Sequence, residues 1–230
     1  MDNRRSATVA PGGKTSLLQG VTDLAVYWVS TGLVWAYFRY LGRGQVVGSL
    51  PAGGGAILTP NHVSYLDWLV LHLVLRFRFG RRVRFVAKER LLQNPLWRNI
   101  LRQTRCVVVG ESRLSLGAVR EIERALAAGE LVVIFPEGTR SADGRLGAAR
   151  RGVGWLVARC GVPVVPVALG GFYENWPRHK RLPRVLPRPM TVRIGSPLSP
   201  AAALETAGSP ECFGARLIEA IRSLGEEMQQ

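Results

Sequence analysis

The chain has 230 residues, an apolar fraction of 47% and a formal net charge of +15, from 31 Lys and Arg against 16 Asp and Glu. The length fits one domain, or one domain with an appendage, and the apolar fraction is ordinary for a globular protein that buries a core. The excess of cations favours acidic partners such as nucleic acid, anionic membranes or phosphorylated small molecules. The three cysteines are far apart and form no CxxC pair, so the sequence predicts reduced thiols and no metal site.

The N-terminal part predicts an attachment to a membrane. Residues 1–14 are polar and predict a flexible tail, and residues 15–45 predict a membrane-associated helical segment. Within it, residues 24–38 are uncharged and rich in aromatic side chains, which favour the headgroup boundary. A helix of this length rises about 22 Å, short of a bilayer core of about 30 Å, so we expect it to dip into one leaflet. A buried helix and a true span are the alternatives.

The predicted apolar face of this N-terminal helix comprises Leu24, Trp28, Trp35 and Phe38.

From residue 46 onward, apolar runs predict strands at 55–59, 81–88, 105–110, 131–135, 162–169 and 190–198. Amphipathic patterns predict helices at 64–75, 116–130, 149–161 and 212–228. This alternation predicts a single α/β domain over residues 46–230, with a mostly parallel, twisted sheet flanked by helices on both faces.

Two basic stretches interrupt these patterns. Residues 76–85, RFRFGRRVRF, alternate arginine with apolar residues, which is typical of a strand with one charged face. That face is either a solvated sheet edge or a contact for anionic headgroups. Residues 175–190 are rich in proline and arginine and predict a surface loop.

The segment TPNHVSYLDWLV, residues 59–70, places His62 five residues before Asp67 and directly after a predicted strand. Ser64 and Asp67 fit a capping box at the start of the next helix, where the macrodipole stabilises an acid. On a regular helix, five residues correspond to a rotation of roughly 140°, so His62 and Asp67 would not share a face. If His62 lies in the preceding loop, however, its ring can reach the carboxylate. A helix cap and a catalytic pair therefore both stay open.

A second polar segment, IFPEGTRS at residues 134–141, also follows a buried strand. Gly138 permits a tight turn, and Arg140 offers a planar fork to a phosphate. The alternative is a local salt bridge between Glu137 and Arg140 in a solvated loop. Both segments lie at the carboxyl ends of predicted strands, the edge where open α/β sheets bind ligands. We therefore predict one site that combines a possible base with an anion clamp.

These residues resemble a known family. NHVSYLD (61–67) looks like the NHx4D signature, and FPEGTR (135–140) like the second signature, of the glycerolipid acyltransferases, with the 1-acylglycerol-3-phosphate acyltransferases as the nearest subgroup. AKERLLQNPLW (87–97) and VPVVPVALGG (162–171) resemble further family blocks, in the family's order. One block departs, because the family usually carries an arginine just after the strand at 105–110. Either Arg113 serves from a shifted position or that role is lost.

The resemblance implies transfer of a fatty acyl group from acyl-CoA or acyl carrier protein to the free hydroxyl of a lysophospholipid. The expected acceptor is 1-acyl-sn-glycerol-3-phosphate, which would give phosphatidate. His62 would be the general base and Asp67 would orient its ring. The implied substrate-binding residues are Glu137, Gly138, Thr139, Arg140 and Arg113. Backbone amides near Ser64 are candidate oxyanion donors.

The resemblance also implies that the enzyme needs no metal or redox cofactor and works at the cytoplasmic face of a membrane. Its partners would be membrane lipids, the acyl carrier and the lysophospholipid. Another lysolipid or glycerol phosphate is the alternative acceptor. The more distant alternatives are a basic protein that binds nucleic acid or anionic lipid, and a hydrolase with Ser64 as nucleophile. The sequence has no recognised nucleic-acid motif and no GxSxG elbow around Ser64, so we expect no nucleic-acid partner.

Overall fold

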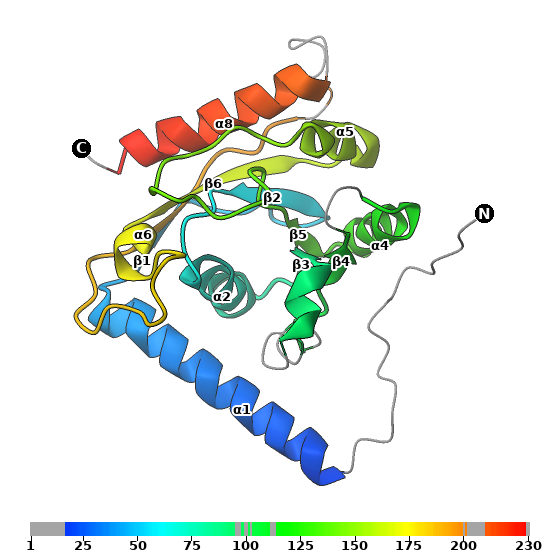
Figure 1. The fold of residues 1–230 in the computed structure, drawn as a ribbon. Coiled ribbons are helices and arrows are strands. Elements are labelled where there is room, and N and C mark those ends of the chain that lie inside the picture. Colours follow the sequence, from blue (N-terminus) through cyan, green and yellow to red (C-terminus); the bar gives the residue numbers. More distant parts are fainter. Residues whose placement is uncertain are drawn as a thin grey trace.

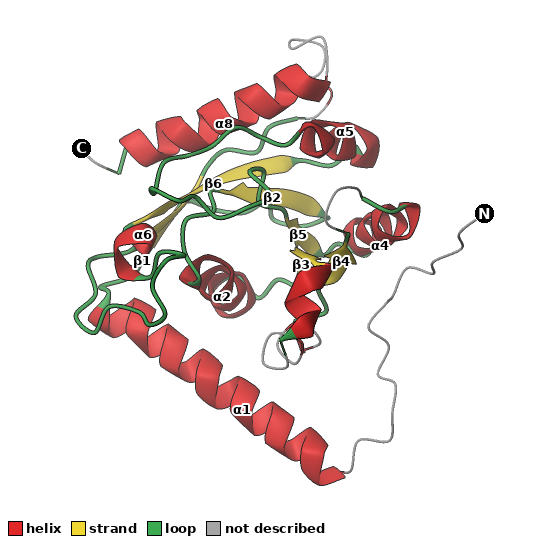
Figure 2. Cartoon of the chain, viewed as in Figure 1, coloured by secondary structure: helices red, strands yellow, loops and turns green. Residues whose placement is uncertain are grey.

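A computed structural model of the chain describes residues 17–94, 98, 101, 103–110, 114–199, 201 and 210–228. The predicted tail at 1–14 and the predicted contact residue Arg113 lie outside these residues. In the described part, one seven-stranded sheet lies between two layers of helices (Figures 1 and 2). The predicted fold, a single α/β domain with helices on both faces of the sheet, is confirmed.

The sheet is mostly parallel. Its strands are β1 (Gln45–Val47), β2 (Ala56–Pro60), β3 (Val83–Lys88), β4 (Val107–Val109), β5 (Leu131–Val133), β6 (Val164–Gly170) and β7 (Thr191–Ile194), in the spatial order β1-β7-β6-β2-β5-β3-β4. Strand β7 pairs antiparallel with β6 and parallel with β1, so these two strands run against the other five. Strand β2 lies at the centre between β5 and β6, and all of its residues are buried.

The helices are α1 (Leu17–Ala36), α2 (Leu66–Leu73), α4 (Leu116–Ala127), α5 (Arg151–Cys160), α6 (Phe172–Asn175) and α8 (Pro210–Glu226). Helices α4, α5 and α8 cover one face of the sheet, and α2 with the end of α1 covers the other (Figure 1). Successive strand residues point to opposite faces, so Ile57 packs in the α4, α5 and α8 layer while Leu58 packs in the α2 layer.

Short helical turns follow three of these elements, namely η1 (Tyr37–Leu41), η2 (Val74–Arg78) and η3 (Glu89–Gln93). The prediction of a charged strand face over residues 76–85 is wrong, because η2 extends to Arg78 and strand β3 begins only at Val83. Gly80 breaks the run with φ +64°, a conformation that glycine adopts without strain. After it, Arg81 donates to the carbonyl of Pro51 (2.8 Å) and Arg84 pairs with Glu130, so both arginines bind within the protein.

Helix α1 turns only one side toward the body of the protein. Phe38, in the η1 turn that follows it, is fully buried, and Trp35 packs against the same core, whereas Leu33 is 67% exposed. Trp35 and Phe38 therefore face the core and not a bilayer, because an apolar pattern on all sides does not select the face that meets the core. No helix within the described residues combines the length and the apolar character needed to cross a bilayer.

A partly buried hydrogen bond joins α1 to α2. Tyr27 Oη lies 2.8 Å from Nε2 of His72, which is 7% exposed. Burial, with a smaller contribution from the charge of Arg76, lowers the pKa of His72 from 6.5 to about 4. The folded protein therefore holds a neutral ring at pH values where the unfolded chain binds a proton.

This arrangement predicts an acid-dependent loss of stability. The contribution of His72 is present above pH 6.5 and is lost as the pH falls toward about 4, by up to about 3 kcal/mol. Urea denaturation of the wild-type protein and of His72→Gln between pH 7 and pH 4 measures it. The difference in unfolding free energy between them is expected to shift in favour of the variant as the pH falls. A difference that stays constant over this range would contradict the assignment.

Candidate active site

The two polar segments of the sequence meet at one edge of the sheet. Strands β2 and β5 are parallel neighbours, with Leu58 opposite Val133, so the chain leaves both strands at the same edge. The backbone N–H of Ser141 donates to the carbonyl of His62 (2.7 Å), which joins the two segments directly. Residues 61–67 and 134–141 therefore form one site at the carboxyl edge of the sheet.

His62 and Asp67 form a hydrogen-bonded pair, with 2.8 Å between Nδ1 and Oδ2. The carboxylate of Asp67 is fully buried, and its Oδ2 also accepts from the backbone N–H groups of Val63 (2.6 Å) and Ser64 (2.8 Å). Asp67 is thus a helix-start acceptor and a histidine partner at once. Because an ionised carboxylate only accepts hydrogen bonds, Nδ1 carries the hydrogen and Nε2 has a lone pair that can take a proton.

Two further contacts hold the histidine loop, and the sequence patterns predicted neither of them. The His62 ring stacks on Phe135, with 3.9 Å between the ring centroids. The Asn61 side chain accepts from the Leu169 N–H (2.7 Å) and donates to the Leu169 carbonyl (3.2 Å), which ties the end of β2 to β6. The signal for Asn61 was present, since it is the first residue of the NHx4D pattern.

The Glu137 carboxylate stabilises the loop that contains His62. Its Oε1 accepts from the backbone N–H of His62 (2.7 Å), and its Oε2 accepts from that of Gly147 (2.9 Å). Burial raises the pKa of this carboxyl, and the two hydrogen bonds oppose that rise. Both oxygens bind backbone, so the alternative of a salt bridge to Arg140 is wrong. Glu137 is 6% exposed and positions His62, while the predicted contact between Glu137 and substrate stays a prediction.

Arg140 is held in place but keeps a donor uncommitted. Its guanidinium carbon lies 3.6 Å from the centroid of the Tyr65 ring, and its backbone carbonyl accepts from Arg178 (3.2 Å). Its Nη1 atom is buried and has no hydrogen-bond partner among the described residues. A buried, charged donor without a partner is costly, so this atom is suited to an anionic ligand.

One cavity of about 1030 Å³ brings these groups together. His62, Gly138, Thr139 and Arg140 all line it. The other charged lining residues are Lys88, Arg90, Arg150 and Arg178, and the apolar ones include Trp68, Phe85, Leu91, Leu101, Leu114 and Leu156. The cavity therefore combines a base, a group of cations and an extensive set of apolar lining residues. Arg178 was not predicted, because it lies in the basic loop at 175–190, far along the chain from both signatures.

The chain matches the Acyltransferase family over residues 45–170. It belongs to this family. It is 30% identical over 147 residues to a 1-acyl-sn-glycerol-3-phosphate acyltransferase of Cocos nucifera, over 62% of this chain and 46% of that protein. It is also 40% identical over 106 residues to the lyso-ornithine lipid O-acyltransferase of Rhizobium meliloti, over 45% of this chain and 34% of that protein. The chain therefore spans less than half the length of these two curated relatives.

A solved structure extends the likeness to most of the chain. The crystal structure of PlsC, the 1-acyl-sn-glycerophosphate acyltransferase of Thermotoga maritima, is similar with a TM-score of 0.67 and 27% sequence identity. The alignment covers 92% of this chain and 83% of that one. The described elements from α1 to α8 thus belong to a fold that occurs in a solved acyltransferase.

The prediction that backbone amides near Ser64 are oxyanion donors in this acyltransferase-family protein is wrong, because these amides donate to groups of the protein itself. The N–H groups of Val63 and Ser64 donate to Asp67. The N–H of Tyr65 donates to the carbonyl of Trp176 (3.2 Å), and that of Leu66 donates to Ser64 Oγ (3.1 Å). The amides at the start of α2 hold the pair and the neighbouring loop.

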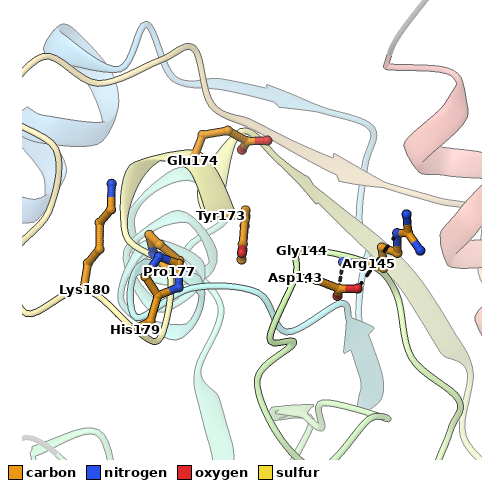
Figure 3. A pocket seen from close by; sticks show the side chains of 8 residues that line it. All are labelled: Asp143, Gly144, Arg145, Tyr173, Glu174, Pro177, His179 and Lys180. Atoms are coloured by element: carbon orange, nitrogen blue, oxygen red, sulfur yellow. Dashed lines mark hydrogen bonds and ion pairs between the residues drawn. The ribbon is translucent and has the colours of Figure 1, made fainter.

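A second, smaller hollow of about 390 Å³ is lined by Asp143, Gly144, Arg145, Tyr173, Glu174, Pro177, His179 and Lys180 (Figure 3). Asp143 accepts from Ser141 Oγ (3.0 Å) and from the N–H of Arg145 (3.1 Å). The Tyr173 hydroxyl donates to the carbonyl of Ala142 (3.0 Å). These contacts shape the loop that follows the second family signature, and the larger cavity holds the candidate chemistry.

Proposed function

We propose that the protein transfers a fatty acyl group from an acyl thioester to the free hydroxyl of a lysophospholipid, and that 1-acyl-sn-glycerol-3-phosphate is the acceptor. The observation that carries this proposal is that His62 and Arg140 line one cavity. A base and a guanidinium in one cavity fit a substrate that carries both a hydroxyl and a phosphate. Membership of the Acyltransferase family supports the same reaction.

The proposed reaction uses the acceptor as nucleophile. Nε2 of His62 takes the proton of the acceptor hydroxyl while the oxygen attacks the thioester carbonyl. The new C–O bond forms, the C–S bond breaks, and the thiolate leaves with the proton that the imidazolium returns. The Asp67 carboxylate, 2.8 Å from Nδ1, holds the ring and stabilises the imidazolium. No step requires a metal or a redox cofactor, and coenzyme A or acyl carrier protein carries the acyl group.

The cations of the cavity suit the phosphate of the acceptor. Arg140 offers the buried Nη1 atom that lacks a partner among the described residues. Lys88, Arg150 and Arg178 line the same cavity. A planar guanidinium can bind two phosphate oxygens at once, which a lysine cannot do. The apolar wall of the cavity suits an acyl chain.

We further propose that the protein works on the cytoplasmic face of a membrane, where both the acceptor and its product reside. Val29 and Leu33 of α1 are 63% and 67% exposed, which supports contact with lipid. The net charge of +15 favours anionic headgroups. Removal of residues 1–41 would also remove the buried Phe38, so substitutions on the exposed side are the better test of this contact.

A second acceptor class follows from one relative. The lyso-ornithine lipid O-acyltransferase of Rhizobium meliloti is 40% identical over the aligned part. Ornithine is an amino acid and carries no phosphate, but Arg140 can also bind a carboxylate. The two acceptor classes therefore differ in the anion presented to the same guanidinium.

Purified protein with one labelled acyl thioester and a panel of acceptors tests the proposal. The panel comprises 1-acyl-sn-glycerol-3-phosphate, glycerol 3-phosphate and a lyso-ornithine lipid. We expect the highest kcat/KM with 1-acyl-sn-glycerol-3-phosphate. A higher value with the lyso-ornithine lipid would replace the acceptor, and the absence of transfer to all three would overturn the reaction.

Arg140→Lys is expected to raise the KM for the acceptor about tenfold and to leave the KM for the acyl donor unchanged, because lysine loses the bidentate fork. Steady-state kinetics with each substrate varied in turn measures this. Arg145→Lys is the matched control, since Arg145 lies five residues further along the same β5–α5 connection with its side chain 90% exposed. An equal rise in both KM values would assign Arg140 a structural role.

A further inference from the structure

The most exposed large apolar side chains of the described residues gather in one basic loop. Val185, Leu186 and Leu182 are 86%, 79% and 77% exposed. The surrounding segment 177–190, PRHKRLPRVLPRPM, holds five Lys and Arg residues and no Asp or Glu. Single exposed apolar residues are ordinary on a protein surface, but three within five positions among unopposed cations indicate an interaction site.

The backbone holds this loop in a defined shape. The buried Asn175 binds its base, accepting from the Arg188 N–H (2.8 Å) and donating to the Arg188 carbonyl (2.9 Å). The Asn175 carbonyl accepts from the Arg184 N–H (2.8 Å), and Arg184 Nε donates to the Leu186 carbonyl (2.7 Å). Prolines at 183, 187 and 189 restrict the chain further. The loop thus presents its apolar side chains outward although its backbone is fixed, so ordering costs little on binding.

We propose that residues 180–188, the docking loop, bind an anionic lipid bilayer. Leu182, Val185 and Leu186 enter the headgroup region, and the exposed cations of the loop contact lipid phosphates. These cations are Lys180, Arg181, Arg184 and Arg188. Charge complementarity selects this occupant, because a partner protein with a hydrophobic patch alone would leave the cations unpaired, whereas an anionic bilayer accommodates both.

The docking loop continues the exposed apolar surface of the N-terminal helix. The hydroxyl of Tyr37 in η1 donates to the carbonyl of Arg184 (2.7 Å). Tyr40 and Leu41 of η1 are 73% and 60% exposed. In Figure 1 the yellow-to-orange loop lies beside the light-blue end of α1. The two elements can therefore contact the same bilayer.

The loop is also bonded to the active site, and this part of the inference rests on the proposed function. The carbonyl of Trp176 accepts from Ser64 Oγ (2.8 Å) and from the Tyr65 N–H (3.2 Å), between His62 and Asp67. Arg178, two residues before the docking loop, lines the cavity. A bilayer bound to residues 180–188 therefore lies close to the cavity that would receive a membrane-borne acceptor.

Vesicle flotation of the full chain tests the docking loop without any measurement of turnover. The triple variant L182S/V185S/L186S is expected to bind vesicles of phosphatidylglycerol and phosphatidylcholine at least about tenfold more weakly than the wild type, because three apolar side chains no longer enter the bilayer. Leu116→Ser is the matched control, since Leu116 is 70% exposed on α4 in the other helix layer. It is expected to bind like the wild type.

Two further arms separate docking on an anionic bilayer from charge-independent adsorption and from self-association. Pure phosphatidylcholine vesicles are expected to bind the wild type at least about tenfold more weakly, since each basic residue near an anionic surface contributes about fivefold. Light scattering reports the oligomeric state of both proteins. Unchanged flotation of the triple variant would overturn the proposal. If flotation is unchanged and the variant also loses self-association, the loop binds a second copy of the chain instead. If the wild type transfers no acyl group, the proposed function is wrong, but the flotation result still tests whether the docking loop binds a bilayer.

Discussion

His62→Ala is expected to lower kcat for acyl transfer by about 10²- to 10⁴-fold, which is the usual contribution of a positioned base. The variant removes the only imidazole among the described residues that lines the larger cavity. The alanine leaves Asp67 bonded to the N–H groups of Val63 and Ser64, so the start of α2 persists. Single-turnover assays with a labelled acyl thioester and 1-acyl-sn-glycerol-3-phosphate measure the effect.

His179→Ala is the control for this substitution. His179 is exposed and lines the smaller hollow, so turnover is expected to stay within about twofold of the wild type. Vesicle binding by His62→Ala is expected to match the wild type, because the ring lies inside the cavity. If His62→Ala retains full turnover, His62 is not the base.

Asp67→Asn is expected to lower kcat by up to about 10⁴-fold, because the asparagine no longer holds the ring in the productive tautomer or stabilises the imidazolium. It is also expected to lower the unfolding free energy by about 1–3 kcal/mol, because a neutral amide oxygen accepts less strongly from the Val63 and Ser64 N–H groups. Steady-state kinetics and urea denaturation measure the two effects separately.

The double variant His62→Ala with Asp67→Asn distinguishes a catalytic pair from two independent contributions. If the residues act as a unit, the double variant loses about as much activity as His62→Ala alone. Asp143→Asn is the control, since Asp143 is an exposed carboxylate that lines the smaller hollow. Additive losses would mean that Asp67 acts only through the stability of α2.

Short-range sequence patterns were enough to predict the order of the helices and strands and the position of both signatures relative to them. The run GAILTPNH predicts a buried strand followed by polar residues, and the structure places β2 at 56–60 with His62 after it. The same holds for LVVIFPEG and β5. Burial of a strand on both faces selects apolar residues along it, and this selection is visible in one sequence. Strand β1 was not predicted, because a three-residue edge strand leaves little such pattern.

The other features of the site depend on contacts between segments that are far apart in the sequence. Strands β2 and β5 are neighbours although they are far apart in the chain. The hydrogen bond from the His62 N–H to Glu137 likewise joins residues that are 75 positions apart. Such pairing joins segments that are far apart in the sequence, so no local pattern specifies which strands become neighbours. The buried face of α1 and the entry of Arg178 into the cavity are decided in the same way.

The histidine–aspartate segment shows the division most clearly. By itself the sequence determined that a helix begins near Ser64 and that Asp67 lies in its first turn, because capping is a local interaction. Tertiary structure decided that His62 folds back over that turn, because Glu137, Ser141 and Phe135, in the loop after β5, hold its backbone and ring. A side chain in a loop takes its direction from the residues that pack against it, and here those residues lie in the loop that follows β5.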